Sequence, residues 1–265
     1  MISIELFLNL LNELIAALVI FLLGYYISKI PKSIGNYKLK KFFGNSIFKG
    51  NFKIVYGIIR KNIQDEKSCD EEALQVYQKK YHDGKTIGME GYFTIISDRT
   101  LQAYSYIIRE LAKYTKSVNI STDEFSNLDL NNSFLTLGGS ISNELTYFIL
   151  NQESNRFFQF IGFADKPKNE WRIETIDQSL EKVFFNRSFS KDYGIILKIK
   201  NTRFKDHNFI VCAGLGSWGT SGAAWYLANN WKNLYKEFKT EEFGIILEVA
   251  VGNDTSAVRV YPETV

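Results

Sequence analysis

The sequence predicts an α/β protein with one N-terminal transmembrane helix, followed by a Rossmann-like three-layer domain with a mixed or mainly parallel sheet. Three observations predict this fold class. The first thirty residues are mostly apolar, short apolar runs later alternate with amphipathic stretches, and two glycine turns each join an apolar run to a helical pattern. With 265 residues, of which 45% are hydrophobic and 23% charged, the chain is long enough for one large domain and an appendage.

The composition excludes several classes of function. Cys69, Cys212, His82 and His207 are the only cysteines and histidines, and none has metal-ligand or redox spacing. We therefore expect no metal, no cofactor and no histidine-dependent triad. A net charge of +3 is too small to indicate nucleic-acid binding.

Residues 1–30 are predicted to form a transmembrane anchor. The run from Leu14 to Ile27 reads LIAALVIFLLGYYI, and apolar residues continue outward from it. A helix over this segment is long enough to cross a bilayer, and Pro31 is expected to end it. A cleaved signal peptide is disfavoured because Glu5 and Glu13 replace the basic residues that precede such a signal.

Charge next to this segment predicts its orientation. Residues 31–50 form a basic connector, and residues 51–265 form the soluble domain. No acidic residue lies between Lys29 and Lys61, whereas nine basic residues do: Lys29, Lys32, Lys38, Lys40, Lys41, Lys49, Lys53, Arg60 and Lys61. The positive-inside rule then predicts a single-pass protein of the cell inner membrane with its domain in the cytoplasm.

Polar residues of the anchor fall on one helix face. Taken at 100° per residue, Glu5, Asn9, Asn12 and Glu13 form one stripe that also contains Ala16. Placing such polar and charged side chains in the lipid interior costs free energy. Three interpretations stay open: the outer residues lie among headgroups, the helices form a homo-oligomer without a pore, or they line a pore.

The soluble domain is predicted to alternate strands and helices. We expect strands over 51–60, 91–98, 117–123, 132–137, 156–163, 171–177, 192–201, 209–213 and, as the last strand, 243–252. Helices are expected over 65–80, over 99–115 with Asp98 as N-cap, from about 140, and up to residue 238 after the second glycine turn.

The first glycine turn follows an apolar strand and precedes a helix. Its glycines are Gly138 and Gly139, and Ser140, Ser142 and Asn143 add polar groups beside them. A strand, a glycine turn and a helix N-terminus can together bind a phosphate, because free backbone N–H groups and the positive helix end point at the turn.

The second glycine turn matches G-x-G-x-x-G through Gly214, Gly216 and Gly219. Three hydroxyl residues complete the predicted ligand site at the helix opening: Ser217, Thr220 and Ser221. Too little chain follows for an ordinary dinucleotide fold. Close packing of a helix on a sheet, without a ligand, is the alternative. In a parallel sheet both turns would face one crevice.

A resemblance rests on three short motifs: a GGxxxN turn (Gly138, Gly139, Asn143), a DYG strand (Asp192, Tyr193, Gly194) and an AGxxxxGT helix opening (Ala213, Gly214, Gly219, Thr220). Together they resemble uncharacterised bacterial Rossmann-like domains of the nucleotide-sensing kind. With a transmembrane helix in front, the architecture is similar to membrane effectors of bacterial anti-phage systems, such as membrane-associated CARF proteins and cyclic-nucleotide-gated CBASS or Pycsar effectors.

This resemblance implies a sensor that binds a nucleotide-like ligand, with cyclic nucleotides among the candidates. Its other partners would be membrane lipid and further copies of the chain, but no nucleic acid. Ligand binding would alter membrane integrity through oligomerised helices. The alternative is a membrane-anchored enzyme acting on a nucleotide or NAD-like substrate, with Glu144, Asp192 and Asp254 as candidate acid–base groups. An anchored scaffold is the third possibility.

Overall fold

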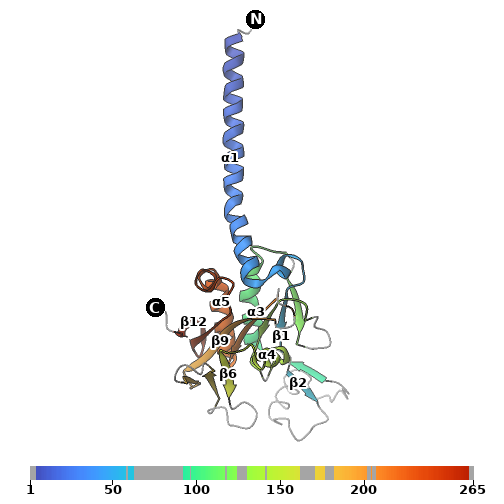
Figure 1. Ribbon diagram of the computed structural model, residues 1–265, viewed down its shortest axis with the longest axis vertical. Helices are drawn as coiled ribbons and strands as arrows, with labels where there is room; N and C mark the ends of the chain where they lie inside the picture. Colours follow the sequence, from blue (N-terminus) through green and yellow to red (C-terminus); the bar gives the residue numbers. More distant parts are fainter. Residues whose placement is uncertain are drawn as a thin grey trace, which may run out of the picture.

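The computed structural model describes residues 4–57, 59–62, 92–95, 97–116, 118–123, 130–140, 142–161, 171–176, 182–201, 204 and 207–262. They form a long N-terminal helix that stands out from an α/β domain (Figure 1). The predicted helix over 65–80 lies outside the described residues.

Helix α1 (Ile4–Phe43) is continuous, so the prediction that Pro31 ends the helix is wrong. Proline costs about 3 kcal/mol inside a helix because it lacks an N–H group and crowds the preceding turn. Packing beyond Pro31 offsets this cost, since Leu39, Phe42 and Phe43 are buried in the domain. The predicted connector is therefore mostly helix, followed by a 3₁₀ turn, η1 (Asn45–Phe48).

The outer part of α1 is apolar and exposed. Eight large apolar side chains between Leu14 and Leu23 each expose 43–70% of their surface. Among the residues that the structure describes, however, no helix is long and apolar enough to cross a membrane. The predicted transmembrane span is therefore not confirmed. Of the predicted polar stripe, the structure describes the side chains of Glu13 and Ala16, which are exposed.

The main sheet has seven strands in the order β12-β11-β9-β10-β5-β1-β4. Four neighbours are parallel: β10 (Asn208–Gly214), β5 (Phe134–Leu137), β1 (Lys53–Tyr56) and β4 (Asn119–Thr122). Three more are antiparallel: β9 (Lys191–Lys200), β11 (Phe243–Ala250) and β12 (Asn253–Tyr261). The α/β class with a mixed sheet is confirmed.

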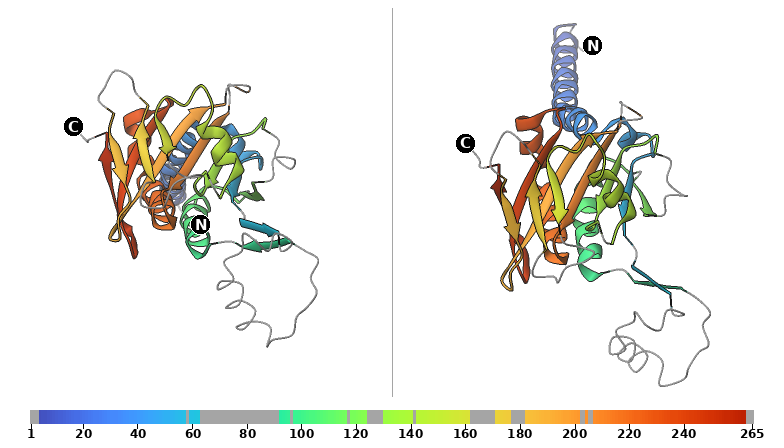
Figure 2. Two further views of the ribbon diagram at one scale, coloured as in Figure 1. Left: turned by 90° about the horizontal axis from the view of Figure 1, so that it is seen from below. Right: turned by 60° about the horizontal axis from the view of Figure 1, so that its bottom comes forward.

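Two hydrophobic clusters lie on opposite faces of this sheet. One face is covered by α3 (Asp98–Leu111), α5 (Ser217–Phe238) and the base of α1. The other is covered by α4 (Glu144–Leu150) and by a three-stranded sheet of β6 (Phe158–Ile161), β7 (Arg172–Thr175) and β8 (Phe184–Asn186). Figure 2 shows these layers, and the arrangement is consistent with a Rossmann-like layout.

Several predicted boundaries are corrected. The strand expected over 51–60 is two strands, β1 and β2 (Ile59–Asn62), and β2 pairs with β3 (Tyr92–Ile95). Ser97, rather than Asp98, is the N-cap of α3, since its side chain accepts a hydrogen bond from the Arg99 N–H group. Strands β8 and β12 were not predicted, so 243–252 is not the last strand.

The base of α1 packs at the amino end of the parallel strands. The Phe43 ring lies 5.9 Å from the ring of Phe52, directly before β1, and 6.0 Å from that of Trp231 on α5. The Phe42 ring lies 5.9 Å from Phe243 at the start of β11. The glycine turns follow the carboxyl ends of β5 and β10, so α1 and the predicted ligand site lie at opposite ends of the sheet.

Candidate functional site

The two glycine turns lie side by side, as expected for neighbouring parallel strands. The Gly138 N–H group donates a hydrogen bond to the Cys212 carbonyl oxygen over 3.1 Å. A β-carbon at Gly139 would lie 3.1 Å from the Gly214 carbonyl oxygen. Both turns therefore belong to one site at the carboxyl edge of the sheet.

In the first turn, protein groups already bind the N–H groups at the start of α4. The Asn143 side chain is the N-cap and accepts from the Thr146 N–H group over 2.9 Å, while its amide donates to the Leu137 carbonyl over 3.0 Å. The Asp123 carboxylate accepts from the Glu144 N–H group over 2.9 Å. Asn143 therefore has a structural role, which suits its burial.

The crevice between β1 and β5 is also filled. After β1 the chain continues to β4 on one side, and after β5 it continues to β10 on the other side. Open α/β sheets bind ligands between two strands whose connections run in opposite directions in this way. A β-carbon at Gly57, just after β1, would lie 1.5 Å from the Ser142 carbonyl oxygen. The backbone of the first glycine turn therefore occupies this position, and only glycine at residue 57 allows so close an approach.

In the second turn, the Asp192 carboxylate takes the place that a phosphate would take. Asp192 is fully buried. Its Oδ1 atom accepts from the Gly216 N–H group over 3.0 Å, and its Oδ2 atom accepts from the Gly219 N–H group over 2.8 Å. Burial raises the pKa of this carboxyl, which the Gly219 hydrogen bond and nearby Arg187 partly counteract. The helix N-terminus thus binds an internal anion.

The glycines of the second turn allow close contact of α5 with the sheet. β-carbons at Gly214 and Gly219 would lie 2.4 Å from the Thr220 backbone nitrogen and 2.3 Å from the Tyr193 carbonyl oxygen. A β-carbon at Gly194 would lie 2.2 Å from the Gly219 carbonyl oxygen. The glycines are thus explained by the close-packing alternative, and no ligand is needed to account for them.

The predicted hydroxyl residues divide into two groups. Thr220 and Ser221 are buried, and their hydroxyls bond to the Gly216 and Trp218 carbonyls of their own helix. Ser217 is exposed and Ser140 and Ser142 are half-buried. Of these residues, only Ser217, Ser140 and Ser142 can contact a ligand that approaches from solvent.

Two arginines that the sequence reasoning missed lie at the start of α5. The Arg99 guanidinium lies 4.3 Å from the centre of the Trp218 ring. The Arg187 guanidinium carbon would lie 2.9 Å from a β-carbon at Gly216. Neither arginine belongs to a motif, and they come from the start of α3 and from the segment after β8, so no spacing in the sequence indicates that they meet. Arg99 is paired with Asp98 over 3.0 Å, and Arg187 lies near the Asp192 carboxylate.

The acid–base candidates lie on both faces of the sheet. Asp192 caps α5, Asp254 on β12 accepts from the Tyr106 hydroxyl over 3.1 Å, and Glu144 opens α4 on the opposite face of the sheet. Within the described ranges, no group of three or more His, Cys, Asp or Glu side chains could hold a metal ion.

Comparison of the chain with protein-family models, with curated proteins and with solved structures found no match. The function is therefore inferred from the chain's own geometry. Two features carry that inference: the exposed apolar helix and the two arginines at the carboxyl edge.

Proposed function

We propose that the protein is a membrane-anchored sensor that holds its α/β domain against the cytoplasmic face of the inner membrane. The observation that carries this proposal is the exposure of the apolar side chains on α1. Ile20, Phe21, Leu22 and Leu23 are consecutive, so they face all sides of the helix. A helix that is apolar on all sides needs an apolar environment. Covering each such side chain is worth roughly 1.5–3 kcal/mol.

Basic residues beside the apolar part support this orientation. Lys38, Lys40 and Lys41 lie in the last turns of α1, next to the domain. Anionic lipids of the cytoplasmic leaflet attract such residues. The domain would then face the membrane with the amino edge of its sheet and turn the glycine loops away from it.

The ligand that we propose is a nucleotide-like anion at the carboxyl edge. Arg187 and Arg99 supply guanidinium groups near the first turn of α5, and Ser217 supplies an exposed hydroxyl. Because Asp192 holds the N–H groups of this turn, a phosphate would bind to the arginines outside it or would displace the carboxylate. Arginine suits either mode, since its planar fork matches phosphate oxygens.

A sensor agrees better with these features than the enzyme alternative does, because the candidate carboxylates of Asp192 and Asp254 are engaged in structural contacts. Signalling from ligand to membrane would pass from α5 to the base of α1, which share the Phe43–Trp231 contact. As a hypothesis, occupancy then changes the packing of α1 helices in a homo-oligomer and alters membrane integrity, as in an anti-phage effector.

Ligand binding can be tested with a panel of linear and cyclic nucleotides, measured by calorimetry on the full-length chain in detergent. We expect Arg187→Ala to weaken the binding of whichever nucleotide binds wild type by about tenfold or more, the loss typical of one hydrogen bond to a charged group. Arg109→Ala is the matched control, because Arg109 lies in the last turn of α3, away from this edge. No binding by wild type across the panel would reject the sensor.

A further inference from the structure

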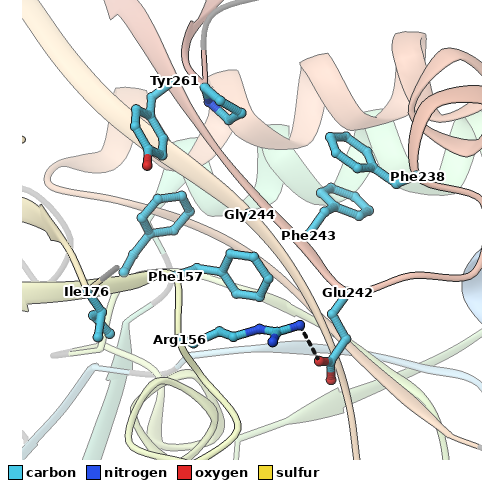
Figure 3. A pocket seen from close by; sticks show the side chains of 10 residues that line it. Arg156, Phe157, Ile176, Phe238, Glu242, Phe243, Gly244 and Tyr261 are labelled. Carbon is cyan, nitrogen blue, oxygen red and sulfur yellow. Dashed lines mark ion pairs between the residues drawn. The ribbon is translucent and has the colours of Figure 1, made fainter. Parts of the chain in front are cut away.

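A cavity lies at the end of the sheet that faces α1. It has a volume of about 580 Å³ and forms where α5 ends, β11 begins and β12 ends (Figure 3). Phe243, which contacts Phe42 of α1, is part of its lining. Small-molecule sites have volumes in this range. The glycine loops lie at the opposite end of the sheet, so a ligand here is independent of the one proposed there.

Aromatic side chains of Phe157, Phe158 and Tyr261 lie along the cavity. The Phe158 ring lies 6.1 Å from that of Tyr261 at an interplanar angle of 73°, and 6.3 Å from that of Phe157 at 51°. Gly244 brings these rings against the sheet, because a β-carbon there would lie 2.5 Å from the Phe158 ring. The Phe158 ring is fully buried, so a ligand would contact the half-buried rings of Phe157 and Tyr261.

A carboxylate lies at the rim of the same cavity. Glu242 is half-buried, and its Oε1 atom accepts a hydrogen bond from the Lys200 N–H group over 2.7 Å. The Arg156 guanidinium reaches its Oε2 atom only at 3.8 Å, and the Arg156 side chain is 74% exposed. Figure 3 shows this ion pair beside the Phe157 ring. The backbone therefore fixes the negative charge, while the positive charge is loosely held.

We propose that this pocket binds a small organic cation that carries an alkylated ammonium group. Aromatic ring faces are negative and attract such cations, which shed water readily because alkyl groups cover the charge. Glu242 supplies the counter-charge, and Arg156 is the protein's own cation at this position. The fixed carboxylate would repel an anion, and it would make no favourable interaction with a neutral apolar ligand.

Such a cation could be a soluble molecule or the choline-type headgroup of a lipid. Both have the same chemistry, and the experiment below distinguishes the two sources. Choline is therefore the probe, and 3,3-dimethyl-1-butanol, which has the same shape without the charge, is its control.

The test is a ligand-observed NMR titration of the full-length chain in a maltoside detergent. We expect choline to bind at least about tenfold more tightly than its neutral analogue. Glu242→Gln should weaken choline binding by about tenfold, although its amide oxygen can still accept from Lys200. Glu241→Gln should leave binding unchanged, because Glu241 is exposed and lies outside the lining. Arg156→Gln should maintain or strengthen binding, since it removes a competing cation.

Equal binding of choline and the neutral analogue, loss of binding in Arg156→Gln, or no binding of choline would each overturn the proposal. Nanodiscs of phosphatidylcholine identify the source. Loss of the choline signal in their presence indicates a lipid headgroup, an unchanged signal indicates a soluble cation, and both results support the proposed chemistry.

Discussion

Asp192→Ala is expected to lower the free energy of unfolding by at least about 3 kcal/mol, because it leaves buried backbone donors without an acceptor. The Asp192 carboxylate accepts from the N–H groups of Gly216, Gly219 and Tyr193. Removing it also leaves the positive end of α5 without its anion. Urea denaturation of the full-length chain in detergent measures the loss.

Two comparisons identify the cause of this loss. Asp192→Asn should be less destabilising, because the amide retains one acceptor oxygen and avoids burying a charge. Inorganic sulfate should stabilise Asp192→Ala more than wild type, because it can occupy the vacated helix end. If Asp192→Ala is as stable as wild type, the carboxylate is not the internal anion of α5.

Lys198→Met is expected to raise the free energy of unfolding by about 3 kcal/mol at pH 7. Lys198 on β9 is 1% exposed, and its Nζ atom has no hydrogen-bond partner among the described residues. Its Nζ atom lies over the Phe42 ring, 5.2 Å from the ring centre. Methionine has a similar length and removes the buried charge.

The gain should depend on pH. Burial lowers the pKa of Lys198 from 10.5 to about 8, against the nearby carboxylates of Glu241 and Glu242 and with a small contribution from the Lys200 charge. Between these two pH values the unfolded chain binds more protons than the folded one, so wild-type stability rises with pH. The advantage of Lys198→Met should therefore be largest below pH 8 and decline towards pH 10.5. A constant advantage would show that the Lys198 charge is not its cause, and the same profile in Lys200→Met would show that another group titrates.

The long apolar elements of the domain could be predicted from the sequence. Strands β9, β10 and β11 and helix α5 lie where the pattern placed them, because each is buried along most of its length. Strand β12 was missed because it forms the sheet edge and buries only two of its residues, Asp254 and Ala257. The end of α1 was misplaced because the residues that offset the cost of Pro31 are contacts with distant segments.

The candidate site could be predicted only in part. The G-x-G-x-x-G spacing correctly located a strand, a turn and the helix start at Ser217. The same spacing cannot distinguish a bound phosphate from a carboxylate of the chain itself. Asp192 precedes Gly216 by 24 residues, and only the pairing of β9 with β10 brings them together. Arg99 and Arg187 meet α5 for the same reason, through tertiary packing rather than local pattern.

Depth-dependent fluorescence quenching tests the membrane anchor most directly. The fluorophore is attached to Ala17→Cys, an exposed position within the apolar part of α1, or to Lys236→Cys on the domain as a control. Cys69 is replaced by serine, and Cys212 is buried. In phosphatidylcholine vesicles that contain lipids quenching at mid-chain, we expect strong quenching at Ala17→Cys and little at Lys236→Cys. Equal, weak quenching at both positions would contradict insertion of α1 into the bilayer.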